Sequence, residues 1–154
     1  MTPRAERTRE ALIDATVAAL REDGSFTTEQ VAGLAGVSVA TVYNRIPEGR
    51  DGLLAGALDR ALFRLVAVTA EALTVEHLLD EGLECVMVAL VDGLVGVFDE
   101  EALVLRSALA RLPESRLLRD AYRHREAEAR ESNRRFVELG QAAGRINPFF
   151  PVDG

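Results

Sequence analysis

"TTEQVAGLAGVSVATVYNRIP", residues 27–47, has the pattern of two short helices joined at a glycine. Thr27 is suited to cap the first helix, and Gln30 three residues later completes the sequence of a capping box. Ser38 is suited to cap the second helix through its hydroxyl oxygen. Gly36 lies between them, where glycine takes a positive φ without strain. The spacing therefore predicts a helix, a tight turn and a second helix.

The two predicted helices have apolar inner faces and a more polar outer face. The side chains expected to face inward are Val31, Ala32, Leu34, Ala35, Val37, Val42 and Ile46. Pro47 ends the second helix, because proline cannot donate the next backbone hydrogen bond. The side chains left outward on this helix are Val39, Ala40, Thr41, Tyr43, Asn44 and Arg45. Two helices joined in this way form the helix-turn-helix layout, whose second helix fits the major groove of DNA.

The polar residues of this region are suited to two kinds of DNA contact. Arg45 and Asn44 are the candidate base readers, because arginine can pair bidentately with guanine and asparagine with adenine, each for about 1–3 kcal/mol of discrimination between bases. The candidate contacts to the phosphate backbone are Thr28, Thr41, Tyr43 and Arg50. For the Tyr43 ring we expect packing on the first helix of the chain, with its hydroxyl left for a phosphate. Three further arginines, which either follow the DNA or form a solvated helix end, are Arg4, Arg7 and Arg9.

The distribution of charge matters more than its total. A net charge of −7 argues against a nucleic-acid partner. Residues 30–47, however, contain no Asp or Glu. Residues 1–65 hold eight Arg against nine acids, for a net −1, whereas residues 66–154 hold ten against sixteen, for a net −6. The acidity therefore belongs mainly to the C-terminal part.

The rest of the chain follows a helical pattern and contains no convincing strand, so we predict an all-α fold. Apolar residues at helical spacing predict helices over 4–23, 50–65, 75–98, 100–112 and 114–143. Gly24 is expected to end the first of them. Segment 75–98 is apolar over much of its circumference and is expected to be a central, buried helix. In the last helix, Glu126–Arg130 and Glu131–Arg135 are expected to form ion pairs.

The N-terminal third resembles a known family. "REALIDATVAALREDG…FTTEQVAGLAGVSVATVYNRIP…RDGLLAGAL" is similar to the DNA-binding region of the tetracycline-repressor (TetR) family of bacterial regulators, over about residues 9–62. The positions that carry the likeness are Ala32, Gly36-Val37-Ser38, Thr41-Val42-Tyr43 and Leu53-Leu54. The chain departs from the family at three positions. The family usually has an aromatic residue at the position of Ile46, often a histidine at that of Arg45, and a lysine at that of Arg50.

The resemblance implies a helix-turn-helix DNA-binding domain over 1–49 and a helical domain over 50–154 that binds a small apolar effector and dimerises. The chain stops about where the family's last two helices begin. It is therefore either a fragment or dimerises through segments such as 75–98 and 114–143. Most apolar residues of the second domain are expected to be ordinary core. The side chains expected to contact the effector are Met87, Val91 and Phe98.

These expectations amount to a transcriptional regulator of TetR type, a repressor released from double-stranded operator DNA by a small effector and acting as a homodimer. The alternative is an all-α dimerisation or protein-interaction module whose helix-turn-helix no longer binds DNA. The acidic balance and the atypical "YNRI" at 43–46 motivate this alternative.

Other functions find few residues to support them. His77 and His124 lack ligand-like spacing, so no metal or other cofactor is expected, and no nucleophile motif suggests an enzyme. Cys85 lies among apolar residues, which favours a buried, inert thiol over a redox sensor. The longest apolar run, 85–98, is too short to cross a bilayer. No secretory signal opens the sequence, so we expect a cytoplasmic protein.

Overall fold

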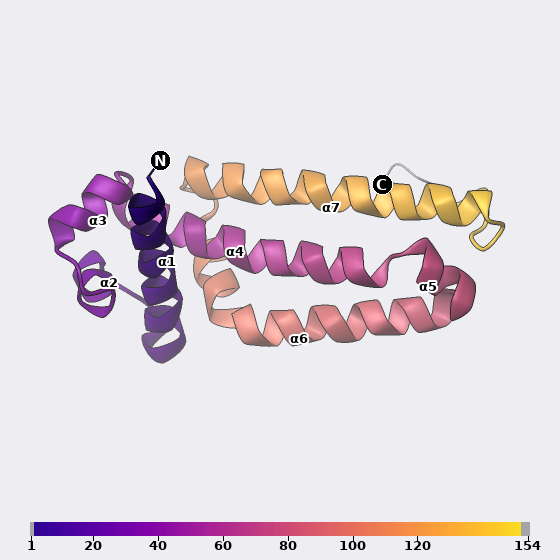
Figure 1. The fold of residues 1–154 in the computed structure, drawn as a ribbon, viewed down its shortest axis with the longest axis horizontal. Helices are drawn as coiled ribbons and strands as arrows, with labels where there is room; N and C mark the ends of the chain where they lie inside the picture. Colours follow the sequence, from indigo (N-terminus) through magenta and orange to yellow (C-terminus); the bar gives the residue numbers. More distant parts are fainter. Residues whose placement is uncertain (1, 152–154) are drawn as a thin grey trace. The chain divides into compact units, whose positions relative to one another are not determined.

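The computed structural model describes residues 2–151, and this part of the chain is all-α, as predicted (Figure 1). It contains seven helices and no strand within these residues. The helices are α1 Pro3–Asp23, α2 Thr28–Leu34, α3 Val39–Arg45, α4 Gly49–Ala72, α5 Val75–Asp80, α6 Gly82–Arg111 and α7 Arg116–Ala142.

The chain divides into two compact units. The first consists of the residues up to Ala61 together with Glu101–Tyr122, and the second of Leu62–Glu100 together with the chain from Arg123 onward. Helices α4, α6 and α7 each contribute residues to both units. The first unit thus adds parts of three long helices to the segment 1–49 that the sequence singles out.

Helices α1, α2 and α3 pack against one another in the first unit (Figure 1). Helix α1 ends as predicted at Gly24, which has a φ of 69° and donates its N–H to the Leu20 carbonyl at 2.9 Å. The core beneath the three helices is aliphatic and closed to solvent. Its fully buried members include Leu12, Leu20, Val31, Val42, Ile46, Leu53, Leu54 and Leu58.

In the first unit, ion pairs join α4 and α6 to α1. Arg60 on α4 pairs with Glu10 at 2.8 Å and also with Asp14, both on α1. Burial alone would lower the pKa of Arg60, but the hydrogen bonds and charges of Asp14 and Glu10 outweigh it and raise the pKa above its ordinary value. From α6, the buried Glu101 pairs with Arg21 of α1 at 3.4 Å.

The second unit has a small core where α5, α6 and α7 meet. Leu78, Val86 and Phe136 are buried together, one from each helix. The side chains packed against this cluster are Leu73, Val137 and Ile146. Gly93 lets α6 approach α4 closely, because a Cβ at this position would lie 2.5 Å from the Val68 side chain.

The course of the chain through α5 and α6 differs from the prediction. The expected helix over 75–98 breaks after Asp80, and Gly82 begins α6 with a φ of 84°. The expected boundary near residue 100 does not exist, because α6 runs without interruption to Arg111. Glycine permits the break, whereas nothing in the sequence around residue 100 removes a backbone donor.

The prediction of a central, buried helix over 75–98 is wrong. Within this segment, Leu78, Val86 and Val97 are buried, but a whole face of α6 is exposed. Cys85 is exposed as well, so the expectation of a buried thiol is also wrong. The reason is that only one side of α6 meets neighbouring helices in the second unit, so an apolar residue on the other side has nothing to pack against.

Helix α7 is close to its predicted span. Its Glu126–Arg130 pair forms as expected, with an oxygen–nitrogen distance of 3.2 Å. Glu131 pairs with Arg134 at 2.6 Å rather than with Arg135, because residues three apart on a helix are neighbours just as those four apart are. None of the helices in residues 2–151 combines the length and apolar character that crossing a membrane requires.

Candidate nucleic-acid interface

The turn between α2 and α3 has the geometry that its sequence predicts. Gly36 takes a φ of 67°, in the left-handed region where a side chain is strained. Its N–H bonds to the Gly33 carbonyl at 3.2 Å, and the Val37 N–H bonds to the Ala32 carbonyl at 3.0 Å. These bonds close the end of α2 and direct the chain into α3.

Both helices start at their predicted caps. The Thr27 hydroxyl accepts the Gln30 N–H at 3.1 Å, and the Ser38 hydroxyl accepts the Thr41 N–H at 3.1 Å. The reciprocal half of the expected capping box is missing, because the Gln30 amide donates to the Asp23 carboxylate at 2.6 Å instead. That bond ties the first turn of α2 to the end of α1.

The inner face of this helix pair is as expected except at one position. Val31, Ala32 and Val42 are buried, as is Ile46 at the end of α3. Leu34, however, is 53% exposed, so the expectation that it faces inward is wrong. The buried side of α2 is set by residues three and four apart, such as Thr28, Val31 and Ala32, and Leu34 lies outside this row. Ala35 and Val37, also expected inside, are partly buried.

The outer side of α3 carries the predicted residues. Ala40, Asn44 and Arg45 are exposed, whereas Val39 and Thr41 are partly covered. Within residues 2–151, neither Asn44 nor Arg45 has a side-chain hydrogen bond or ion pair with the rest of the chain. The donors of both side chains are therefore available to an external ligand. Val42 and Ile46 fix the opposite side of the helix in the core.

Tyr43 is held by the start of α4. Its side chain is half exposed, and a Cβ at Gly49 would lie 2.9 Å from the ring carbon Cε1. Gly49 also has a φ of 58°, so its backbone conformation and the ring beside it both favour glycine. The ring thus lies against Gly49 at the start of α4, and its expected packing on the first helix of the chain stays a prediction.

The other predicted phosphate contacts differ in how freely they can move. Arg50 is exposed, but its Nε donates to the Phe26 carbonyl at 3.3 Å and its guanidinium lies 5.0 Å from the centre of the Phe26 ring. The Thr41 hydroxyl shares a hydrogen bond of 2.9 Å with that of Ser38. Thr28 is only 7% exposed, so little of its side chain can meet a ligand.

The sequence analysis does not identify Phe26 or Gly49 as parts of this surface. Phe26 is buried and acts by stacking under Arg50, and Gly49 acts by leaving room for Tyr43. No sequence periodicity points to either residue, because both lie between helices or at a helix start. Of the three N-terminal arginines, Arg4 and Arg7 are exposed and Arg9 is partly buried.

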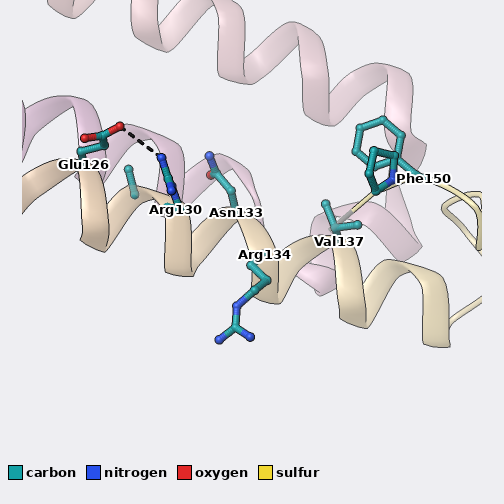
Figure 2. Close-up of a pocket in the computed structure, with 8 residues that line it drawn as sticks. Glu126, Arg130, Asn133, Arg134, Val137 and Phe150 are labelled. Carbon is teal, nitrogen blue, oxygen red and sulfur yellow. Dashed lines mark hydrogen bonds and ion pairs between the residues drawn. The ribbon is translucent and has the colours of Figure 1, made fainter. Parts of the chain in front are cut away.

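The predicted effector contacts lie on an exposed helix face. Met87, Val91 and Phe98 are 42%, 53% and 52% exposed on the open face of α6, and their contact with an effector stays a prediction. The second unit does have an open hollow of about 350 Å³ on α7, where Figure 2 shows Arg130 paired with Glu126. Its lining is about equally polar and apolar and consists of Glu126, Ala129, Arg130, Asn133, Arg134, Val137, Phe150 and Pro151.

The candidate surface thus consists of the outer side of α3 with Arg50 beside it. Within residues 2–151 no group of three His, Cys, Asp or Glu side chains is arranged to hold a metal ion.

A scan of protein-family models and searches of curated proteins and of solved structures found no match to this chain.

Proposed function

We propose that this chain is a DNA-binding transcriptional regulator of the TetR type, with α3 as the helix that enters the major groove. The observation that carries the proposal is a short helix anchored by Val42 and Ile46, whose outer Asn44 and Arg45 side chains have no partner within the described chain. Buried anchors on one side and unoccupied donors on the other are what recognition of base edges requires.

Each exposed residue then has a role set by its chemistry. Arg45 reads guanine and Asn44 reads adenine, while the methyl groups of Val39 and Ala40 suit contact with thymine. Tyr43 and Thr41 donate to phosphates through their hydroxyls. Arg50 also serves the backbone, and its stack on Phe26 reduces the rotamer freedom it loses on binding. Thr28 has no role in this proposal, because it is buried.

The regulatory part of the proposal follows the family resemblance. Two copies bind two half-sites roughly 34–36 Å apart, one duplex turn. A small apolar effector in the second unit favours a state whose recognition helices are wrongly spaced, and the protein leaves its operator. In this scheme the protein is a repressor.

The competing candidate is an all-α interaction module that has lost DNA binding. It is favoured by the net charge of −7 and by the exposed apolar face of α6. The two candidates differ in one measurable property, because neutralising phosphates with arginine releases counterions and gives a steep dependence of affinity on salt.

The test is selection of bound sequences from a library of random DNA duplexes, followed by fluorescence anisotropy with the enriched duplex. Between about 50 and 200 mM NaCl, we expect the affinity to fall at least tenfold. Arg116→Ala is the control for the loss of a positive charge outside the α3 surface, since it removes one highly exposed arginine from α7. If no sequence were enriched and any binding to random duplexes did not depend on salt, the interaction module would be the better proposal.

A further inference from the structure

The exposed face of α6 in the second unit is a continuous apolar surface. Six large apolar side chains lie on it, each with between 41% and 57% of its surface exposed. We call this surface the α6 stripe, and its members are Leu83, Met87, Val88, Val91, Val95 and Phe98. A helix that exposes so many large apolar groups is incompletely packed by its own chain.

The spacing of the stripe matches another helix. Val88, Val91, Val95 and Phe98 are separated by three, four and three residues. This alternation is the pattern of a helix–helix seam, in which each side chain enters a space between residues of the facing helix. The packing partner that such a row requires is itself helical and apolar.

The size of the stripe also suits a protein interface. Six large side chains, each about half exposed, present roughly 500 Å² of apolar surface, near the upper end for the largest patch on a monomer. With a polar rim around it, the area approaches the roughly 800 Å² that each partner buries in a standard interface. The stripe is therefore large enough to hold two chains together.

The charges beside the stripe restrict what covers it. Glu84, Asp92 and Asp99 are exposed on the same helix, and none of them has an ion pair within residues 2–151. Asp92 and Asp99 border the stripe, whereas Glu84 lies in line with Val88 and Val91, one turn before them, so the apolar row begins at Val88. These acids repel DNA and anionic lipid headgroups. The surface that meets the stripe is therefore an apolar protein face rather than a phosphate-bearing one.

We infer that the α6 stripe is the surface through which two copies of this chain associate around a twofold axis. A twofold interface brings the same patch of each copy together, and a row of valines is complementary to itself. The choice of a second copy as the occupant rests on the proposed function, because one α3 reads a single half-site. Met87, Val91 and Phe98 then belong to a dimer interface rather than to a ligand pocket.

The first test is the molar mass in solution, measured by light scattering over roughly 10 to 100 µM protein. The wild type is expected to have the mass of a dimer, and Val91→Glu that of a monomer with unchanged helical circular dichroism, because a charge in the seam is not tolerated. Ala89→Glu is the matched control: this residue is exposed on α6 but lies away from the stripe, so its variant stays dimeric. A monomeric wild type, or a Val91→Glu dimer, would overturn the inference.

A second measurement holds even if Val91→Glu fails to fold. In a Cys85→Ala background, Val91→Cys and Val95→Cys variants are oxidised singly and as a mixture. A disulfide requires Cβ atoms about 3.5–4.5 Å apart, so a covalent dimer is expected from at least one of these samples and not from Ala89→Cys. Equal cross-linking from position 89 would contradict a seam along the stripe.

The outcomes separate this inference from the proposed function. A dimer that dissociates in Val91→Glu but enriches no DNA sequence leaves the inference standing and removes the function. If the protein binds DNA but its Val91→Glu variant remains dimeric, the proposed function stands and the inference about the α6 stripe is overturned. Because the seam is apolar, the wild-type dimer is also expected to persist at about 0.5 M NaCl, where surface charges are screened, and its dissociation there would contradict the inference.

Discussion

Two exposed helix faces of this protein, the outer side of α3 and the α6 stripe, differ in how each is incomplete. On α3, the inner side is fully buried and the outer side carries the polar Asn44 and Arg45 without internal partners. On α6, the exposed side is apolar and bordered by acids. The contrast teaches that exposure alone does not identify a function: polar groups without partners suit a charged ligand, whereas a regular apolar row suits another helix.

The largest difference between the two faces is expected in stability, when a valine is shortened on each. Val42 of α3 is fully buried and Val88 of α6 is 57% exposed. Val42→Ala should lower the free energy of unfolding by about 2–3 kcal/mol, because it leaves a cavity in the first unit. Val88→Ala, measured under conditions that keep the chain monomeric, should change it by at most about 0.5 kcal/mol. Urea titration followed by circular dichroism measures both, and equal effects would mean that the two faces are not packed differently.

Adding a methyl group gives the converse comparison. A Cβ at Gly52 would lie 2.4 Å from Cγ2 of Ile46, the residue that ends α3, whereas a Cβ at Gly96 on α6 meets nothing within 4 Å. Gly52→Ala should therefore cost about 1–3 kcal/mol through overpacking. Gly96→Ala should stabilise the helix by up to about 1 kcal/mol, since alanine is the better helix former. Thermal melts of the two variants should move in opposite directions, and melts that move together would contradict this account of the packing.

Removing single arginines sharpens the roles assigned within the α3 surface. Arg45→Ala is expected to relax the preference for one base pair by about 1–3 kcal/mol, because only a side chain at a base edge distinguishes sequences. Arg50→Ala is expected to weaken all duplexes alike and to reduce the salt slope by about one. Anisotropy titrations with the enriched duplex and with its single-base variants measure both effects. An Arg45→Ala variant that kept its full preference would exclude base reading by this residue.

The smallest effects are expected from ion pairs on the two units. Arg60→Ala, which removes contacts to Glu10 and Asp14, should cost about 0.5–1 kcal/mol of stability at low salt. As long as Glu10 and Asp14 are both charged, the raised pKa of Arg60 means that this contribution is present below the ordinary pKa of arginine and is lost as the pH rises above it. Arg130→Ala, in a well-exposed pair on α7, should change stability by less than Arg60→Ala. Denaturation at low and high salt checks the order, and a larger effect at Arg130 would reverse it.

The sequence predicts the α2–α3 region well because local chemistry determines it. The caps at Thr27 and Ser38, the turn at Gly36 and the end of α1 at Gly24 each depend on residues within a few positions. The buried Val42 and the exposed Arg45 then follow from helical periodicity. The one error on the inner face, Leu34, arises because a helix of seven residues has too few turns to define its buried side.

The second unit is predicted less well because its packing is not local. An apolar segment such as 82–98 specifies a helix, but the number of neighbours that cover it depends on residues far along the chain. Hence Cys85 and Met87 are exposed although their neighbours in sequence are apolar. In the first unit, the stack of Arg50 on Phe26 and the ion pair of Arg21 with Glu101 also join residues far apart in the sequence, so no sequence motif predicts them.

The measurement that tests the central claim most directly is photo-crosslinking to the enriched DNA duplex from each of the two faces. In a Cys85→Ala background, a photoreactive group is attached to a cysteine at position 44 on α3 or at position 88 on α6. We expect attachment to bases of the duplex from position 44 and none from position 88. No attachment from position 44, or equal attachment from both positions, would contradict the claim that α3 lies in the groove of DNA.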